Sequence, residues 1–189
     1  MDIQSRLSAI VMDTVETIVV ALSIFVVVYL FAAQPNEVKG SSMVPTFHDG
    51  EYILTDKISY KLRDPIRGEV IVFKAPRNPD VDYIKRIIGV PGDKIKVENQ
   101  TVFVNGAPIN EPYIADKTNL FGGSYIKEGE EITVPKGYLW VMGDNRPHSS
   151  DSREFGPIKE SDIIGRAFFR YWPPTVLGLI KTAEYPGGK

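Results

Sequence analysis

The sequence contains no cysteine among its 189 residues, which excludes disulfide scaffolds, cysteine-ligated zinc sites and cysteine nucleophiles. It has only two histidines, too few for a site with three histidine ligands, and we expect neither a metal nor a cofactor. An excess of basic residues is also missing, because 22 lysines and arginines face 24 aspartates and glutamates. Nucleic-acid binding normally requires a basic surface, so no nucleic-acid partner is expected.

Charged residues make up 24% of the chain, but one long stretch has none of them. Residues 17–33 read TIVVALSIFVVVYLFAA, and as a helix they would extend roughly 25 Å, near the lower limit for crossing a bilayer. This run is too uniformly apolar for a core helix with one wet face. Apolar residues spaced three to four apart before it predict an amphipathic lead-in along the membrane surface. We therefore expect residues 1–35 to form a lead-in and a membrane anchor, with the lipid bilayer as a partner.

A cleaved secretory signal is the alternative for the same stretch, and the sequence fits it poorly. Such signals need small residues one and three places before the cut. A cut after Ala33 places Phe31 at the third position. A cut after Ala32 places Leu30 there. We expect a retained single-pass anchor, although Arg6 alone gives little information on its orientation.

The rest of the chain is typical of β-structure, because short runs rich in β-branched and aromatic residues alternate with turn signals. Asn105-Gly106, for example, is a common two-residue hairpin turn. Residues 110–129 are polar and glycine-rich and should form a loop or part of a small lobe. An antiparallel, partly closed sheet system is the most economical fold. We expect strands at 51–57, 69–74, 82–90, 94–97, 101–104, 131–134, 138–142 and 163–172.

Three polar segments are candidates for chemistry, and the first lies just after the anchor. Residues 40–46 read GSSMVPT. Gly40 permits a close backbone approach and Pro45 stiffens the chain that follows, so this loop could aim one hydroxyl and one backbone N–H at a carbonyl. A serine in a loop is by itself an ordinary residue.

The second segment is the expected strand 82–90, in which alternate residues share a face. Lys85 then lies on the same side as Tyr83 and Ile87, which would bury part of it. A free lysine titrates near pH 10.4 and is a poor base at neutral pH, but burial lowers a lysine pKa by up to several units. An edge-strand lysine that prevents aggregation is the simpler interpretation.

The third segment, residues 143–153, reads GDNRPHSSDSR and follows an apolar strand. A solvated turn with local side-chain hydrogen bonds would explain any single residue here. The density of opposite charges favours a braced loop instead. We expect two ion pairs, Asp144 with Arg146 and Asp151 with Arg153.

Four segments occur in order behind the anchor: 42–46 (SMVPT), 67–73 (RGEVIVF), 83–86 (YIKR) and 143–153. Together they resemble the conserved boxes of bacterial type I signal peptidases, which are membrane-anchored Ser–Lys endopeptidases. The first matches Ser-Met-x-Pro-Thr, and the second resembles Arg-Gly-Asp-x-x-x-Phe. The third matches the segment that holds the base, and the fourth matches the box that begins Gly-Asp-Asn-Arg. Four ordered boxes behind an apolar anchor are a specific signal.

The resemblance implies a role for each matched residue. Ser42 would be the nucleophile and Lys85 the general base, with an acyl-enzyme intermediate, and Ser149 would orient the lysine. The Ser42 N–H would form half of the oxyanion hole, and Gly40 stands where some relatives supply a serine hydroxyl as the other half. His148 replaces the family's usual asparagine. The loop would be supported by Asp144, Arg146, Asp151 and Arg153.

The resemblance also implies the substrate and the place of action. Family members cut signal peptides from preproteins after small residues, typically Ala-x-Ala, while the substrate lies extended along a strand edge. The catalytic body would lie outside the plasma membrane, near the secretion translocon. The binding pockets would be lined by Val38, Met43, Phe47, Val72, Tyr83 and Ile84.

The expected organisation is mainly β, with an N-terminal transmembrane helix and an antiparallel, partly closed β-sheet catalytic body. The anchor region would span 1–35. The catalytic domain would comprise 36–96 and 134–180, with a small inserted β lobe at 97–133. Residues 181–189 would be an irregular tail.

Three other functions remain open at this point. A related Ser–Lys self-cleaving repressor protease would carry a DNA-binding helix pair where this chain has an apolar run. A membrane-tethered, non-catalytic β module that only binds a partner would need neither Ser42 nor Lys85. A serine hydrolase with His48 or His148 as its base would need that histidine to face the serine.

Overall fold

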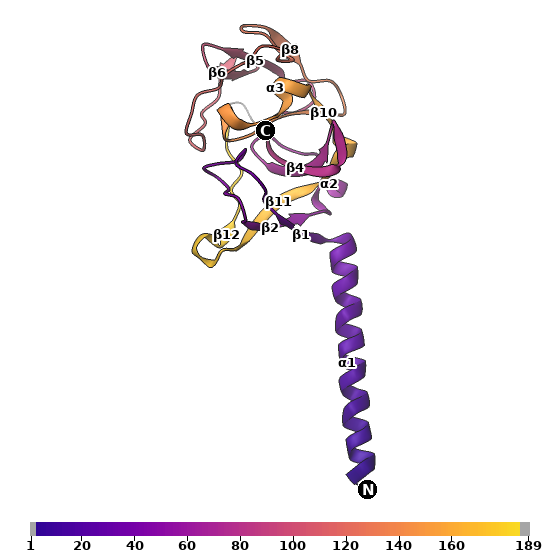
Figure 1. Ribbon diagram of the computed structural model, residues 1–189. Helices are drawn as coiled ribbons and strands as arrows, with labels where there is room; N and C mark the ends of the chain where they lie inside the picture. Colours follow the sequence, from indigo (N-terminus) through magenta and orange to yellow (C-terminus); the bar gives the residue numbers. More distant parts are fainter. Residues whose placement is uncertain (1–2, 186–189) are drawn as a thin grey trace.

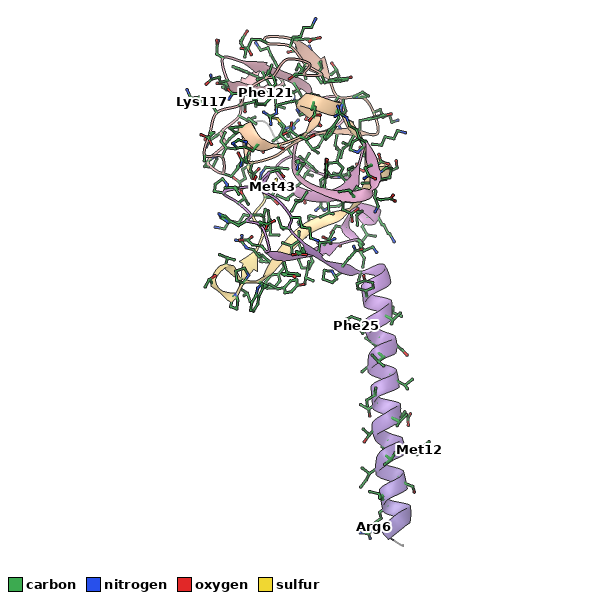
Figure 2. All side chains as sticks on the ribbon, viewed as in Figure 1. Arg6, Met12, Phe25, Met43, Lys117 and Phe121 are labelled. Atoms are coloured by element: carbon green, nitrogen blue, oxygen red, sulfur yellow. The ribbon has the colours of Figure 1, made fainter. Side chains whose placement is uncertain are left out.

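The computed structural model describes residues 3–185, and Figure 1 shows one long helix that projects from a β-rich body. Helix α1 spans Ile3–Phe31, and its segment Arg6–Val27 has the length and composition to cross a membrane. The side chains of Met12 and Phe25 stand out from the helix, away from the body (Figure 2), and are 67% and 64% exposed. A helix that is apolar and unburied needs an apolar medium around it, which a bilayer provides.

The expected amphipathic lead-in does not form a helix of its own. It is continuous with the anchor in α1, because residues 3–16 contain neither proline nor glycine that would end a helix. Strand β1 (Ala33–Glu37) then begins two residues after α1 ends, so the chain passes from the anchor directly into the body.

The body is built on an antiparallel sheet of eight strands. The sheet is open and not partly closed as expected, because β1 and the two-residue strand β10 lie at opposite ends of the strand order and do not pair within residues 3–185. In spatial order its strands are β1, β2 (Tyr52–Asp56), β11 (Ile163–Trp172), β3 (Val70–Ala75), β4 (Asn78–Gly89), β9 (Tyr138–Met142) and β10 (Ile158–Lys159), with β12 (Gly178–Leu179) beside β11.

A second antiparallel sheet of four strands forms a small lobe. Its hairpin turn has positive φ at Asn105 (54°) and Gly106 (81°), as the Asn-Gly pair predicts. Ile95 and Val102 belong to one buried cluster with Trp140 of the main sheet, so the lobe and the body share a core. The strands of the lobe are β5 (Lys94–Glu98), β6 (Thr101–Val104), β7 (Ala107–Pro108) and β8 (Glu131–Thr133), in the order β7-β6-β5-β8.

The described part of the expected tail is irregular but packed on the body. The Ala183 N–H donates to the Gly68 carbonyl oxygen at 3.1 Å. Tyr185 is 8% exposed, and its hydroxyl lies 2.6 Å from the hydroxyl of Tyr113. The remaining elements are the short helices α2 (Ser59–Leu62) and α3 (Ser152–Phe155) and the 3₁₀ turns η1 (Arg146–His148), η2 (Glu160–Asp162) and η3 (Pro174–Val176).

Candidate active site

Ser42 lies in the loop that follows β1, and its neighbours fix this loop to the core. Met43 and Phe47 are each 1% exposed. Both pack in a buried cluster that includes Val38, the residue after β1, and Val72 from β3. Buried apolar side chains on the loop therefore hold the backbone that carries the Ser42 hydroxyl.

The hydrogen-bond partner of the Ser42 hydroxyl is the amine of Lys85, which comes from β4. Lys85 Nζ lies 2.7 Å from Ser42 Oγ and 2.9 Å from the carbonyl oxygen of Ile84. Lys85 is 4% exposed, and Nζ lies 5.1 Å from the centre of the Tyr83 ring, on the strand face that the alternation predicts. The interpretation of Lys85 as an exposed edge lysine is therefore wrong.

Burial lowers the pKa of Lys85 to about 8, because a dry environment penalises the ammonium form. The carboxylates of Asp151 and Asp144 act in the opposite direction, and the Arg153 guanidinium acts in the same direction as burial. At pH 8 about half of the Lys85 side chains are thus neutral, with a lone pair on Nζ that can accept the proton of Ser42.

Asp151 braces the second loop, residues 143–153. Its carboxylate accepts from Arg153 Nη2 at 2.7 Å, which is the ion pair predicted from the sequence, and from the Gly143 N–H at 3.0 Å. Burial by itself would raise the pKa of Asp151, but the charge and hydrogen bonds of Arg153, together with the Gly143 N–H and the Ser149 hydroxyl, hold that pKa below its usual range. The buried carboxylate stays charged and fixes the loop.

The second expected ion pair, Asp144 with Arg146, is not formed. Asp144 pairs instead with Arg86, whose Nη2 lies 2.6 Å from Oδ2, and both side chains are buried. Arg146 begins the turn η1 and forms its ion pair with Glu111 of the lobe. The side chains of Asp144 and Arg146 therefore diverge. Because Arg86 follows Lys85 on β4, the two residues present their charges on opposite faces of the strand.

Ser149 lies between the two loops. Its Oγ is buried beside the Asp151 carboxylate and has no hydrogen-bond partner of good geometry within residues 3–185. A methyl group on Gly143 would overlap this Oγ and would come within 2.5 Å of the Ser42 carbonyl oxygen. Within residues 3–185, Ser149 does not form the expected hydrogen bond to Lys85. Its hydroxyl nevertheless lies close to the serine loop.

Two residues that the sequence did not single out, Thr46 and Asn145, join the loops. Thr46 Oγ1 donates to Asp144 Oδ2 at 2.5 Å. Asn145 Nδ2 donates to the Ser41 carbonyl oxygen at 3.0 Å, and the Asn145 backbone N–H donates to the Ser42 carbonyl oxygen at 3.0 Å. Both residues lie in the polar segments noted above, but the partners of their side chains depend on the tertiary structure.

Ser42 and Gly40 are the two expected positions of the oxyanion hole, and their backbone N–H groups differ. Gly40, with φ of +84°, donates its N–H to Asp49 Oδ1 at 2.6 Å, so this donor is occupied and the expected contribution of Gly40 is not available. The Ser42 N–H has no acceptor among the residues that the structure describes. Ser42 thus combines a hydroxyl that is hydrogen-bonded to the Lys85 amine with a backbone N–H that has no acceptor within residues 3–185.

Neither histidine contacts the serine in the described chain. The His48 side chain is 63% exposed, with Nδ1 3.6 Å from the Glu51 carboxylate. His148 is exposed at the end of η1. The geometry therefore gives no support to a histidine base, and residues 3–185 contain no group of three or more His, Asp or Glu side chains suited to a metal.

A cleft of about 610 Å³ opens beside Ser42 and Lys85. Contrary to expectation, Met43 and Phe47 do not line this cleft, because both side chains pack in the core. Phe47 lines a separate cavity of about 490 Å³. Within residues 3–185, strand β1 pairs only with β2 and is the edge of the sheet, so its other side can accept an extended peptide. The expected pocket residues that do line the cleft are Val38, Val72, Tyr83 and Ile84.

The model of the family "Signal peptidase, peptidase S26" matches residues 11–172, from within α1 to the end of β11. The chain belongs to this signal peptidase family. Signal peptidase IB of Staphylococcus aureus (strain COL) is 39% identical over 174 residues, which cover 86% of this chain and 90% of that protein. Signal peptidase I of Bacillus caldolyticus is 40% identical over 161 residues, which cover 82% and 87%.

A solved structure of signal peptidase I from Enterococcus faecalis V583 is 34% identical to this signal peptidase family member. The match covers 55% of this chain and 97% of that one, with a TM-score of 0.46. Membership of the family confirms the resemblance found in the sequence and makes the chain a serine endopeptidase of the signal peptidase class. The apolar helix α1 is consistent with anchoring in a membrane.

Proposed function

We propose that the chain cleaves signal peptides with Ser42 as nucleophile and Lys85 as general base. The observation that carries this proposal is the 2.7 Å contact between Lys85 Nζ and Ser42 Oγ in a buried setting. The lowered pKa of about 8 supports it, because a base must be neutral near the working pH to accept a proton.

In the acylation step, Lys85 Nζ takes the proton of Ser42 Oγ as Oγ bonds to the carbonyl carbon of the scissile bond. The carbonyl oxygen becomes an oxyanion, which the Ser42 N–H stabilises. The C–N bond then breaks, and the Lys85 ammonium gives its proton to the leaving amine. The signal peptide remains on Ser42 as an ester, and Lys85 is neutral again.

In the deacylation step, Lys85 takes a proton from a water molecule that attacks the ester carbonyl. The ester bond breaks, and the proton returns to Ser42 Oγ. One base therefore serves both half-reactions. We assign Ser149 to the orientation of the lysine, because its buried hydroxyl lies close to the serine loop and beside the Asp151 carboxylate, without a hydrogen bond of good geometry within residues 3–185.

We also propose a preference for small residues one and three places before the cut. The cleft is lined by the branched apolar side chains of Val38, Val72 and Ile84, which fit a small apolar group such as alanine. The open edge of β1 can hold the substrate backbone in an extended form. Ala-x-Ala sites combine both features.

The place of action follows from the anchor. We propose that α1 crosses the plasma membrane and that the body lies on the outer face, where translocated preproteins emerge beside the secretion translocon. The direct connection from α1 to β1 supports this arrangement, because it keeps the cleft next to the bilayer that holds the apolar part of a signal peptide.

The test is cleavage of a preprotein with an Ala-x-Ala site by the detergent-solubilised full chain. Wild type, Ser42→Ala and Lys85→Ala are compared, and mass spectrometry identifies the new N-terminus. Lys94→Ala serves as the matched lysine control, since Lys94 lies in the lobe with a side chain that is 59% exposed.

We expect cleavage after the second alanine by wild type and by Lys94→Ala, and none by the other two variants. Cleavage that survives Lys85→Ala would point to another base and overturn the proposed dyad. No cleavage by folded wild type in the presence of lipid would overturn the proposed substrate.

A further inference from the structure

Asn145 contacts the serine loop at two adjacent carbonyl groups. Its backbone N–H donates to the Ser42 carbonyl oxygen, and this contact needs no particular side chain. Its side-chain Nδ2 donates to the Ser41 carbonyl oxygen at 3.0 Å. This contact requires a donor, because the Ser41 carbonyl oxygen can only accept, and Nδ2 is the donor of the asparagine side chain. The side chain therefore adds one constraint, and that constraint acts on a single peptide group.

That peptide group joins Ser41 to Ser42. A trans peptide unit is planar, so its C=O and its N–H point in opposite directions. Any rotation of the Ser41 carbonyl turns the Ser42 N–H with it. The Ser41 carbonyl oxygen accepts two hydrogen bonds, from the Val44 N–H at 3.1 Å and from Asn145 Nδ2 at 3.0 Å. The Val44 contact lies within the serine loop, whereas Asn145 fixes the same peptide group to the second loop. Together they hold the Ser42 N–H on the opposite side, where it has no acceptor within residues 3–185.

The direction of this N–H matters more here than in a site with two donors. The Gly40 N–H is occupied by Asp49 at 2.6 Å and offers no second hydrogen bond. Hydrogen bonds weaken steeply as the donor angle falls toward 120°. Because the Gly40 N–H is occupied, it cannot compensate for a rotation that turns the Ser42 N–H away from the oxyanion.

We propose that Asn145 is a positioning residue that aims the Ser42 N–H at the oxyanion formed on the scissile carbonyl. This inference rests on the function proposed above. Asn145 acts through the Ser41–Ser42 peptide group and touches neither the substrate nor the reacting atoms. Its effect therefore falls on the transition state, in which the oxyanion exists, and not on the binding of the substrate.

Two variants separate the hydrogen bond from the shape of the side chain. Asn145→Asp has nearly the same shape, but its carboxylate can only accept, so it opposes the Ser41 carbonyl oxygen. Asn145→Ala removes the contact and the side chain together. Both are made in the full chain and assayed in detergent at a temperature at which wild type and variants are folded.

Three quantities are measured for each variant. The first is the pair kcat and KM on a peptide with an Ala-x-Ala site. The second is the inhibition constant of a peptide aldehyde with the same residues before its aldehyde carbon, because Ser42 Oγ adds to this carbon and creates an oxyanion. The third is the dissociation constant of an uncleavable peptide that forms no oxyanion.

We expect kcat to fall about 10- to 100-fold in Asn145→Ala and at least as far in Asn145→Asp, because loss of an oxyanion donor outright costs about 100- to 1000-fold. The inhibition constant of the aldehyde should rise by a similar factor. KM and the dissociation constant of the uncleavable peptide should change less than about threefold. The pH at which activity reaches half its maximum should not move in Asn145→Ala, which adds no charge near Lys85. In Asn145→Asp the new carboxylate should raise the pKa of Lys85, as Asp144 and Asp151 do, so kcat of this variant is compared on its high-pH plateau.

Wild-type kcat in Asn145→Asp would overturn the proposal, since shape alone would then be sufficient. An equal loss of kcat and of uncleavable-peptide binding would assign Asn145 a structural role instead. Wild type and Ser42→Ala are assayed first in the same series. Failure of wild type to cleave, or cleavage by Ser42→Ala, counts against the proposed function, whereas the Asn145 variants test only the positioning.

Discussion

Lowering the pH should inactivate the enzyme by protonating Lys85. Burial places the pKa of this amine at about 8, compared with 10.5 for a free lysine. At about 1.4 kcal/mol for each pKa unit, the difference of about 2.5 units corresponds to about 3 kcal/mol against the ammonium form. Only the neutral amine accepts the proton of Ser42, so kcat/KM should rise with pH and level off above about pH 9.

The size of the effect follows from one titration. With a pKa of about 8, the neutral fraction is about one half at pH 8, about one in eleven at pH 7 and about one in a hundred at pH 6. An unperturbed lysine would be about 0.3% neutral at pH 8, and activity would then keep rising tenfold per unit to about pH 10. The two cases differ in where the plateau begins.

The assay is kcat/KM on a fluorogenic Ala-x-Ala peptide between pH 5.5 and 10.5, with circular dichroism at each pH as a check on folding. Lys94→Ala, which changes an exposed lysine of the lobe, should have the wild-type profile. A plateau that begins below pH 7, or activity that still rises tenfold per unit above pH 9, would refute the argument from burial.

Substitutions around the dyad should separate activity from stability. Gly143→Ala brings a methyl group within 2.5 Å of the Ser42 carbonyl oxygen, so kcat/KM should fall at least about 100-fold with an unchanged circular dichroism spectrum; near-normal kcat/KM would show that the loops can move apart. Asp144→Asn leaves the buried guanidinium of Arg86 without its charged partner, so the free energy of unfolding in urea should fall by about 3–5 kcal/mol, and an unchanged midpoint would contradict this. Because the folded-state pKa of Lys85 is lowered, the unfolded chain binds the lysine proton more tightly than the folded chain does. The resulting loss of stability is fully present below about pH 8 and disappears as the pH rises toward 10.5. Lys85→Met should therefore raise the melting temperature at pH 7, and a gain that does not shrink as the pH rises would exclude burial of the charge as its cause.

The strands were predictable because their signals are local. β-branched runs and turns such as Asn105-Gly106 determine β2 to β6 and β9 to within a few residues. Strand β1 was not predicted, because its sequence, AQPNE, has no β-branched or aromatic residue. It becomes a strand through its pairing with β2, and such a partner cannot be identified from the residues of β1 alone.

The residues of the site were easier to predict than the ion pairs and hydrogen bonds that these residues form. Spacing favoured a pair between Asp144 and Arg146, but the cation that reaches Asp144 is Arg86, 58 residues away on β4. The occupied N–H of Gly40 was equally hidden, because it depends on how the chain returns to Asp49. The segments were found through residue types and family resemblance, whereas the contacts between them depend on the fold.

The short connection from α1 to Ser42 limits how far the nucleophile can lie from the end of the membrane helix. Helix α1 ends at Phe31, and even a fully extended chain from there to Ser42 would reach at most about 40 Å. Part of that path is folded into β1 and the serine loop, so the true reach is shorter. If the proposed function holds, a secreted protein can contain many Ala-x-Ala sequences, but only one that lies within this distance of the bilayer would reach Ser42. The length of the connection between α1 and Ser42 would then contribute to the choice of cleavage site, together with the shape of the pockets.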